Sequence, residues 1–238
     1  MALWSAPTLI QSVPATAITA TSFTISTTLV ANTLVILNLG FGHAATVTGM
    51  TVADGTNSWT VKYVANQATI SGGVLLAYCV PAVGGSFTIT VTRTGSGNIT
   101  SYAGGIMSYV GFNGSSLEDT SVFASNTQTS VNPSVTGNAG TVAGDLLVSV
   151  CSFLTNASSV YSTDTSNGWA NQFNVNNASA GAAIGVDTQI NSGTSGIPSD
   201  PQLAANRKWV IMQVAFKVGP AQRHIIVTRQ SVTRAAFW

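Results

Sequence analysis

The chain has very little charge. Only 6% of its 238 residues are Asp, Glu, Lys or Arg, against about 25% in an average globular protein. Hydrophobic residues still make up 45%, which excludes disorder for most of the chain, because disordered segments are rich in charge and poor in apolar residues. A surface of hydroxyl and amide groups also lacks the net charge that keeps free proteins apart in solution. The composition therefore favours a secreted or assembled protein, with a low-charge soluble domain as the alternative.

Sequence that forms helices is equally scarce. The chain contains a single glutamate, Glu118. No segment repeats apolar residues with the i, i+3, i+4, i+7 spacing of an amphipathic helix between recognisable caps. We therefore expect very little helix.

Segments with strand periodicity are abundant. Apolar and hydroxyl residues alternate in residues 22–29 and 86–92, which predicts half-buried antiparallel strands with a polar outer face. Residues 33–39, 146–154 and 208–217 are apolar on both faces, which predicts central strands covered on both sides. The pair Asp54-Gly55 predicts a hairpin that joins the strand-like runs on either side of it.

Together these runs predict one fold class. Further strand-like runs at residues 72–80, 104–112 and 182–190 bring the expected total to roughly ten to twelve strands, as in an all-β antiparallel β-sandwich of jelly-roll-like form. We expect residues 1–218 to form this domain with its N-terminal segment, and residues 219–238 to form a separate basic arm. The polar stretches 113–141 and 155–206 are expected to be long connections that carry contacts.

Neither a membrane span nor a leader is predicted. The most apolar stretch near the start, residues 29–39, is interrupted by Asn32 and Thr33 and is far shorter than the roughly 20 residues that a transmembrane helix needs. The first 20 residues carry no basic residue and contain two prolines, unlike a signal peptide. We therefore expect no signal peptide and no transmembrane segment.

The two cysteines both lie in apolar runs. Cys79 follows "LLAY" and Cys151 follows "LLVSV", and neither has the CxxC spacing of a metal site. Two separate buried thiols that pack as small hydrophobic residues are the favoured interpretation. A disulfide between two strands of one core is the alternative.

Residues that could support catalysis are few. The only histidines are His43 and His224, whereas a catalytic zinc site usually has three protein ligands and a hydrolytic triad needs a histidine positioned by a carboxylate. No HExxH or GxSxG motif is present. We predict that the protein is not an enzyme and binds no cofactor. A hydrolase would require one of these histidines to meet a carboxylate and a nucleophile in space.

The acidic residues fit turns better than sites. Glu118 and Asp119 are adjacent and would point to opposite faces of an extended segment, which favours a solvated loop over an acid–base pair. Asp54 and Asp164 lie in turn sequences where an aspartate binds nearby backbone N–H groups. Calcium at either aspartate is a lesser alternative.

A glycine-rich segment has a loose dinucleotide-binding spacing, with Gly40, Gly42 and Ala45 after a strand. That fingerprint depends on a helix N-terminus that receives the pyrophosphate. A strand-like run follows here instead, so we interpret the glycines as a turn.

Two aromatic residues stand out in the polar stretch "NGWANQFNV". Trp169 and Phe173 could stack on sugars if they are exposed in a loop, which would make this segment a glycan contact. The alternative is that both rings fold back onto the sandwich.

The C-terminal segment differs from the rest of the chain. Residues 1–206 contain two basic residues and seven carboxylates, whereas residues 207–238 contain six basic residues and no acid. The arginines are too widely spaced for a dense nucleic-acid patch, and a solvated terminus is an alternative. A Gly-Pro break, a strand-like middle and an aromatic end favour an arm that pairs with a neighbouring subunit. The residues expected to attach to a partner are Arg223, Ile225, Ile226, Val227, Arg229, Arg234, Phe237 and Trp238. The opposite charges of arm and body further predict that the arm of one copy meets acidic residues of another.

The order of motifs resembles a family of proteins. "NTLVILNLGF", "VTGMTVADGTNSWTVKYV", "SFTITVTRTGSGNITSYAGGIMSYVGF" with "LEDTSVFASNTQTS", and "AGDLLVSVCSF" are similar to β-sandwich surface proteins of tailed-phage virions, namely capsid decoration or cement proteins, head fibres and tail-associated proteins. The resemblance covers roughly residues 32–216 at the level of pattern. It implies a non-enzymatic sandwich displayed on a virion, often as a trimer, and it supplies no active-site residues.

The sequence and the resemblance together predict a virion structural protein, most simply a capsid decoration or cement protein that covers or stabilises the capsid. The alternative is a receptor- or glycan-binding module of a tail fibre or head fibre. Expected partners are identical subunits, as a homotrimer, and other virion proteins such as the major capsid protein. No membrane contact is expected, and nucleic acid is disfavoured.

Overall fold

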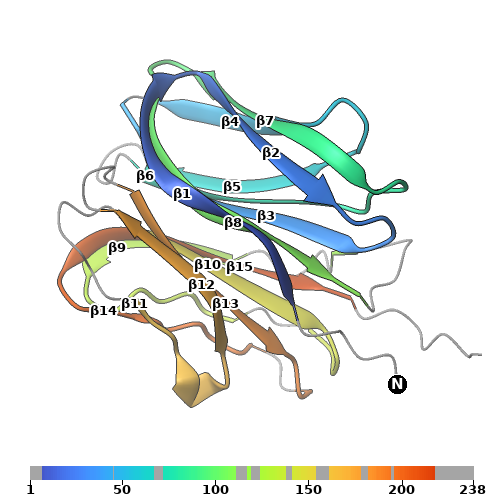
Figure 1. The fold of residues 1–238 in the computed structure, drawn as a ribbon. Helices are drawn as coiled ribbons and strands as arrows, with labels where there is room; N and C mark the ends of the chain where they lie inside the picture. The colour runs from blue at the N-terminus through green and yellow to red at the C-terminus, as the bar shows by residue number, and fades with distance from the viewer. Residues whose placement is uncertain are drawn as a thin grey trace, which may run out of the picture.

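The protein is built from three stacked antiparallel sheets, as Figure 1 shows for the computed structural model. The structure describes residues 7–44, 46–66, 72–110, 117–118, 124–137, 141–153, 161–177, 182–193 and 196–217. The upper sheet has the order β2-β7-β4, with bounds Ser22–Leu29, Gly85–Gly95 and Val47–Ala53. The central sheet has the order β1-β8-β3-β6-β5, with bounds Thr8–Ala20, Ile99–Tyr109, Leu34–His43, Gly72–Cys79 and Thr60–Asn66. The lower sheet has the order β12-β13-β10-β15-β9, with bounds Ala170–Asn177, Ala182–Ile190, Leu146–Phe153, Arg207–Phe216 and Ala124–Ser130.

The predicted fold class is confirmed. The described residues are nearly all strand, every paired strand is antiparallel, and the only helical element among them is the 3-10 turn η1 (Thr165–Asn167). A short ribbon of β11 (Tyr161–Ser162) and β14 (Gln202–Leu203) completes the strands. The sequence predicts a sandwich without specifying that a third sheet is stacked on it, and the jelly-roll connectivity stays a prediction. In the described part of the chain, no helix is long and apolar enough to cross a membrane.

The central sheet is buried on both faces. In β3, Leu34 and Ile36 face the lower sheet, whereas Val35, Leu37 and Leu39 face the upper sheet. All ten residues of β3 and all eight of β6 are buried. Full burial of one such side chain contributes about 1.5–3 kcal/mol to stability, so these strands are where the fold gains most. The central strand predicted at residues 33–39 is confirmed.

The lower sheet is also covered twice. Its inner face carries Val148 and Met212 against the central sheet, while Cys151 and Trp209 lie on the outer face. There they pack with residues of the β11–β14 ribbon and neighbouring loops, among them Val135, Tyr161 and Leu203. The strands predicted at residues 146–154 and 208–217 are therefore central, as expected. The two-stranded ribbon and loops, not a further large sheet, provide the outer cover.

The chain alternates between the upper and central sheets from β1 to β5. For this reason the predicted hairpin at Asp54-Gly55 is wrong: β4 pairs with β7 in the upper sheet, and β5 pairs with β6 in the central sheet. The turn exists, with Gly55 at φ 79°, but it passes the chain from one layer to the next. An Asp-Gly turn determines a local reversal and not the sheet that the next strand joins.

Two further predictions about local structure are corrected. Gly40 and Gly42 lie inside β3 and do not form a turn. A Cβ on Gly40 would lie 2.6 Å from Ser152 Oγ of the lower sheet, so close approach of the two layers explains that glycine. The "NGWANQFNV" segment is not a loop either, because Ala170–Asn177 forms the edge strand β12.

The central and lower sheets also approach each other closely at Gly105 and Phe173. A Cβ built on Gly105 of β8 would lie 2.8 Å from Cζ of the Phe173 ring of β12. The ring thus lies against bare backbone and fills the space that a side chain would need. This contact fixes how near the two layers can lie at the β8–β12 side of the stack.

We expect Gly105→Ala to lower the free energy of unfolding by about 1–3 kcal/mol, the usual cost of overpacking a core. The added methyl group forces the Phe173 ring out of its position. Urea denaturation of Gly105→Ala, Phe173→Leu and the double variant measures the coupling between the two sites. The cost of Gly105→Ala should be smaller in the Phe173→Leu background, and equal costs in both backgrounds would contradict the contact.

Candidate functional site

Asp54 stabilises the turn between β4 and β5 through hydrogen bonds within that turn. Its Oδ1 accepts hydrogen bonds from the backbone N–H groups of Thr56 (2.9 Å) and Asn57 (2.7 Å), and its Oδ2 accepts from Asn57 Nδ2 (2.7 Å) and Trp59 Nε1 (3.1 Å). Burial alone would raise the pKa of this carboxyl group, but these hydrogen bonds together outweigh burial and hold the pKa below its usual value. The predicted role of Asp54 as a turn residue is confirmed.

Asp164 has the same role at η1. It accepts hydrogen bonds from Ser166 Oγ (2.6 Å), Asn167 Nδ2 (2.6 Å) and the backbone N–H of Asp200 (3.1 Å). Burial opposes ionisation here too, and the hydrogen bonds again lower the pKa. The turn prediction is confirmed, and the donors to this carboxylate come from the protein itself.

Asp187 is a fully buried carboxylate in β13 that the sequence reasoning did not single out. Tyr161 Oη donates to its Oδ2 (2.6 Å), while Thr163 Oγ1 and Asn171 Nδ2 donate to its Oδ1 (both 3.0 Å). Burial raises the pKa of Asp187 above its usual value despite these three hydrogen bonds. The network ties the β11 ribbon and β12 to β13, which is a structural use of a buried charge. The sequence around Asp187, "GVDTQ", does not predict this network, because the donors lie far away in the sequence.

A fourth acidic group links the central and lower sheets. Glu118 forms an isolated bridge with Phe216 of β15, accepts a hydrogen bond from Tyr78 Oη (2.7 Å) and pairs with Lys62 Nζ (2.9 Å). The ring of Tyr78 packs edge-on against Phe216 with centroids 5.0 Å apart. Glu118 is therefore engaged between β5, β6 and β15, which corrects the expectation of a solvated loop at this residue. Asp119 lies outside the described residues.

No catalytic or metal constellation forms in the part of the chain that the structure describes. His43 is buried at the end of β3, and His224 lies outside the described residues. Among the described residues, no three or more His, Cys, Asp or Glu side chains come together as metal ligands. The absence of an enzymatic activity stays a prediction.

The two cysteines are separate buried thiols. Cys79 lies between the upper and central sheets, while Cys151 lies on the outer face of the lower sheet, and both are free. Burial raises the pKa of Cys79 to about 12 and raises that of Cys151 as well. The favoured interpretation is confirmed and the disulfide alternative is wrong, because the two thiols belong to different layers.

The aromatic residues proposed to contact glycans are buried. Trp169 is 3% exposed and its indole Nε1 donates to the carbonyl oxygen of Pro198 (2.8 Å), while Phe173 is 8% exposed and packs between the central and lower sheets. Neither presents a ring face to a sugar. The alternative, in which both rings fold back on the sandwich, describes the structure.

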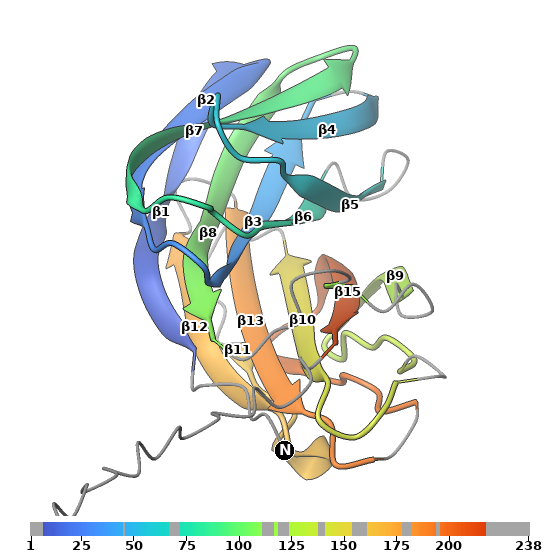
Figure 2. The same cartoon turned by 90° about the vertical axis from the view of Figure 1, so that its right-hand side faces the viewer.

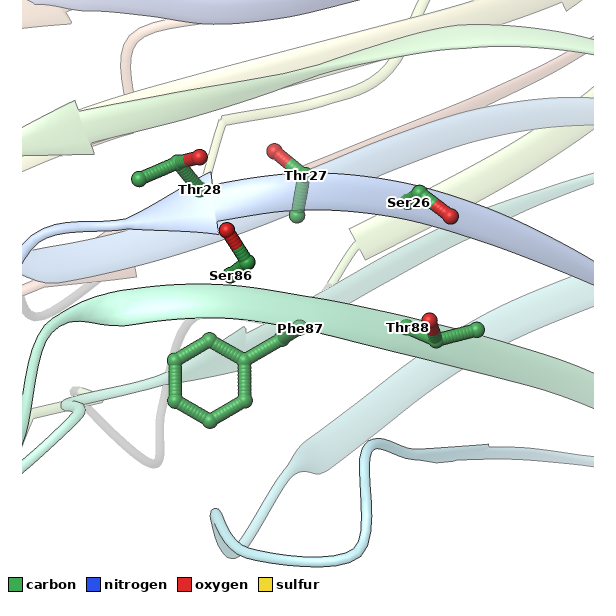
Figure 3. A pocket seen from close by; sticks show the side chains of 6 residues that line it. All are labelled: Ser26, Thr27, Thr28, Ser86, Phe87 and Thr88. Carbon is green, nitrogen blue, oxygen red and sulfur yellow. The ribbon is translucent and has the colours of Figure 1, made fainter.

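The outer face of the upper sheet is covered with hydroxyl groups. Cross-strand pairs on β2 and β7 are Ser22 with Thr92, Thr24 with Thr90, Ser26 with Thr88, and Thr28 with Ser86. A shallow hollow of about 380 Å³ lies between these two strands and is lined by Ser26, Thr27, Thr28, Ser86, Phe87 and Thr88, as Figure 3 shows. Oγ1 of Thr27 is buried and has no hydrogen-bond partner among the described residues. This hollow, which we call the hydroxyl hollow, is a candidate binding feature that the alternation of residues 22–29 and 86–92 could have suggested.

The predicted attachment arm lies outside the described residues, which end at Lys217. This applies to Arg223, Ile225, Ile226, Val227, Arg229, Arg234, Phe237 and Trp238. The arm is expected to meet acidic residues of another copy. Of these, Asp145, Asp164 and Asp187 are buried, and Glu118 is paired with Lys62. These four carboxylates are not free on the surface to receive a basic arm.

Comparison with family models, with curated proteins and with solved structures gives no match to this chain.

We expect Asp187 and Asp54 to affect stability in opposite directions as pH changes. The folded-state pKa of Asp187 is raised, so its contribution to stability is complete below the unfolded pKa of about 3.9 and is lost as pH rises through the folded pKa. The pKa of Asp54 is lowered, so its contribution is complete above the unfolded pKa and is lost as pH falls.

Urea denaturation of the wild type, Asp187→Asn and Asp54→Asn between about pH 4 and pH 7 measures this difference. The stability of the wild type relative to Asp187→Asn should fall as pH rises, whereas its stability relative to Asp54→Asn should not. Two trends of the same sign would contradict the assignment.

Proposed function

We propose that the protein is a structural protein of a tailed-phage virion, most simply a capsid decoration or cement protein. The observation that carries this proposal is where the reactive side chains lie. Four carboxylates form hydrogen bonds or an ion pair within the protein and so hold turns, strands and sheets together, namely Asp54, Asp164, Asp187 and Glu118. Among the described residues, most side chains that remain for contact with other molecules are neutral hydroxyl and amide groups, with a few exposed apolar side chains, which suits permanent packing in an assembly.

The layered core also supports a structural role. A large domain in which two of the three sheets are covered on both faces buries a high share of its apolar surface. Such a core tolerates mechanical and chemical stress because its strands are the last elements to open. The resemblance of the motif order to virion surface proteins adds to this argument.

The proposal is tested on particles of a phage that encodes the chain. Purified virions should contain the protein at a copy number similar to that of the major capsid protein, measured by quantitative mass spectrometry of gel bands. Particles that lack the protein should lose resistance to heat or osmotic shock and regain it when purified protein is added. Absence of the chain from purified virions would overturn the proposal, and a handful of copies per particle would favour a fibre or tail role.

A truncated chain is the matched control for attachment. Deletion of residues 221–238 removes none of the described strands, so the variant should fold with an unchanged free energy of unfolding. It should not rebind to depleted particles. If it rebinds as well as the full chain does, the C-terminal segment is not the attachment arm.

A second candidate function is a receptor- or glycan-binding module, and the hydroxyl hollow is the specific observation that favours it. Its rim carries hydroxyl groups from Ser26, Thr28, Ser86 and Thr88 and no charged side chain. Such a rim suits a neutral glycan, whose hydroxyl groups can replace bound water at modest affinity. Weak sites of this kind act through many copies on one particle.

We expect Thr88→Val to weaken binding of a neutral glycan several-fold, because it removes one hydroxyl group at nearly constant volume. Thr94→Val is the matched control, since Thr94 is exposed on the same strand but outside the hollow. A glycan array identifies the ligand, and titration calorimetry compares the variants. An array without any bound neutral glycan, or equal losses in both variants, would count against this second function.

A further inference from the structure

All large hydrophobic side chains that are exposed in the described residues lie at one end of the sheet stack. We call this surface the apolar end, and its members are Leu9 (45% exposed), Val30 (51%), Val83 (67%), Val110 (54%), Val142 (57%) and Ile190 (41%). Single exposed hydrophobic residues are ordinary on protein surfaces. Their concentration at one end of the stack is unusual, because scattered residues would be expected at both ends of the strands.

The pairing registers place these residues together. Val30 follows the end of β2, and Val83 precedes the start of β7, with Leu29 paired to Gly85. The two loops touch, since the N–H of Asn32 donates to the carbonyl oxygen of Pro81 (2.8 Å). These two valines therefore form one part of the apolar end.

Leu9 and Val110 form a second part. Leu9 of β1 pairs with Met107 of β8, and Tyr109 at the end of β8 pairs with Leu34 at the start of β3. Val110 follows directly. Since Leu34 begins the strand that comes after the Val30 loop, this second part lies at the same end as the first.

Val142 and Ile190 form the third part, in the lower sheet. Ile190 pairs with Leu146, and the loop of Val142 is bound to Asn191 through the N–H of Gly144 (2.8 Å). The contact between Tyr78 and Phe216 places this end of the lower sheet under the same end of the central sheet, because Phe216 pairs with Leu146 and Tyr78 pairs with Ile36.

The chain also leaves the described structure at this end. The arrowheads of β2, β8 and β15 lie on the right-hand side of Figure 1, and Figure 2 views the stack from that side. Lys217 follows β15 and still donates its N–H to the carbonyl oxygen of Leu117 (2.7 Å). Lys217, the last described residue, therefore lies at the apolar end, and residues 218–238 begin there.

We propose that the apolar end binds residues 218–238 of a second copy of this chain. These 21 residues include Ile225, Ile226, Val227, Phe237 and Trp238, an apolar set that matches the exposed valines in character. Fully extended, they reach at most about 75 Å, which is ample to cross a neighbouring domain.

Two copies that meet end to end place each C-terminal segment beside the apolar end of the other, so the contact can be reciprocal. The inference rests on the proposed function as a structural protein packed in an assembly, and it names the surface that receives the segment. Binding is driven by apolar burial, because Asp145, Asp164 and Asp187 are buried and Glu118 is paired with Lys62, so these carboxylates are not available to a basic segment.

Cross-linking between two differently tagged full-length chains tests the inference. One carries Val83→Cys and the other carries Ala235→Cys, and mild oxidation follows mixing. The native Cys79 and Cys151 are buried and do not compete. We expect a disulfide-linked heterodimer in the mixture, and its yield should not fall at high salt, because exposed ion pairs are screened but apolar contacts are not.

Thr94→Cys is the matched control for position. Thr94 is exposed near the end of β7, opposite to the end that carries Val83. Equal yields with Val83→Cys and Thr94→Cys would overturn the inference. So would a link that forms only when both cysteines are in one chain, since the occupant would then be the chain's own segment.

A full-length variant with Val30→Asn and Val83→Asn checks the surface without cross-links. Both side chains are exposed in loops between strands, so the midpoint of urea denaturation should stay close to that of the wild type. Sedimentation velocity should show a shift toward monomer relative to the wild type, and a wild type that is monomeric throughout overturns the inference. This test and the test of the proposed function can fail independently. If the protein is present in virions but no cross-link forms, only the inference is refuted. If the cross-link forms but the protein is absent from virions, only the proposed function is refuted.

Discussion

A sheet that is covered on both faces is the constraint from which the rest of this structure follows. The strands β3 and β6 cannot place a polar side chain in water on either face. Their sequences therefore do not alternate between apolar and polar residues, as those of half-buried strands do. Two neighbouring layers must then each present an apolar face, and their close approach selects glycine, as at Gly40 beside Ser152 and at Gly105 beside the Phe173 ring. Asn38 is a polar residue inside β3: it is fully buried, and its side-chain atoms have no hydrogen-bond partner among the described residues, which costs free energy of folding.

The same constraint explains how the few charges are used. In a fold with so much apolar surface, a carboxylate is tolerated where several donors surround it, and the protein provides such donors from its own Asn, Ser, Thr, Tyr and Trp side chains. Asp187 receives three hydrogen bonds from two other elements, and Asp54 receives four within one turn. A low-charge composition is thus consistent with a protein in which charged groups hold layers and turns together, while hydroxyl groups form the outer face of the upper sheet.

The sequence predicts the local elements better than their arrangement. Residues 146–153 and 209–216 could be identified as central strands because they are apolar on both faces, and Asp54 and Asp164 could be identified as turn residues from their neighbours. The layer that a strand joins is a long-range property, so the alternation of β4 and β5 fits a hairpin and a crossover equally well. The strand β12 was missed because asparagine is rare in strands, although Phe173 and Val175 alternate toward the core. The donors of Asp187 come from two segments at least 16 residues away, around residues 161–163 and at Asn171, and leave no pattern in the sequence.

The edges of the sheets bear on how such a stack can assemble. An open edge strand invites pairing with another chain, and proteins obstruct it with bulges, proline and charge. Here β1 contains three register shifts and Pro14, while β4 and β12 each contain one shift. The edge strand β5 carries the ion pair of Lys62 with Glu118. Extension of a sheet from one copy to the next is therefore obstructed at four of the six outer strands.

The faces of the central and lower sheets are covered, and the outer face of the upper sheet bears hydroxyl groups that water already satisfies. Among the described residues, this leaves the apolar end as the surface where contact with another copy gains most, because only there does association remove exposed valine, leucine and isoleucine from water.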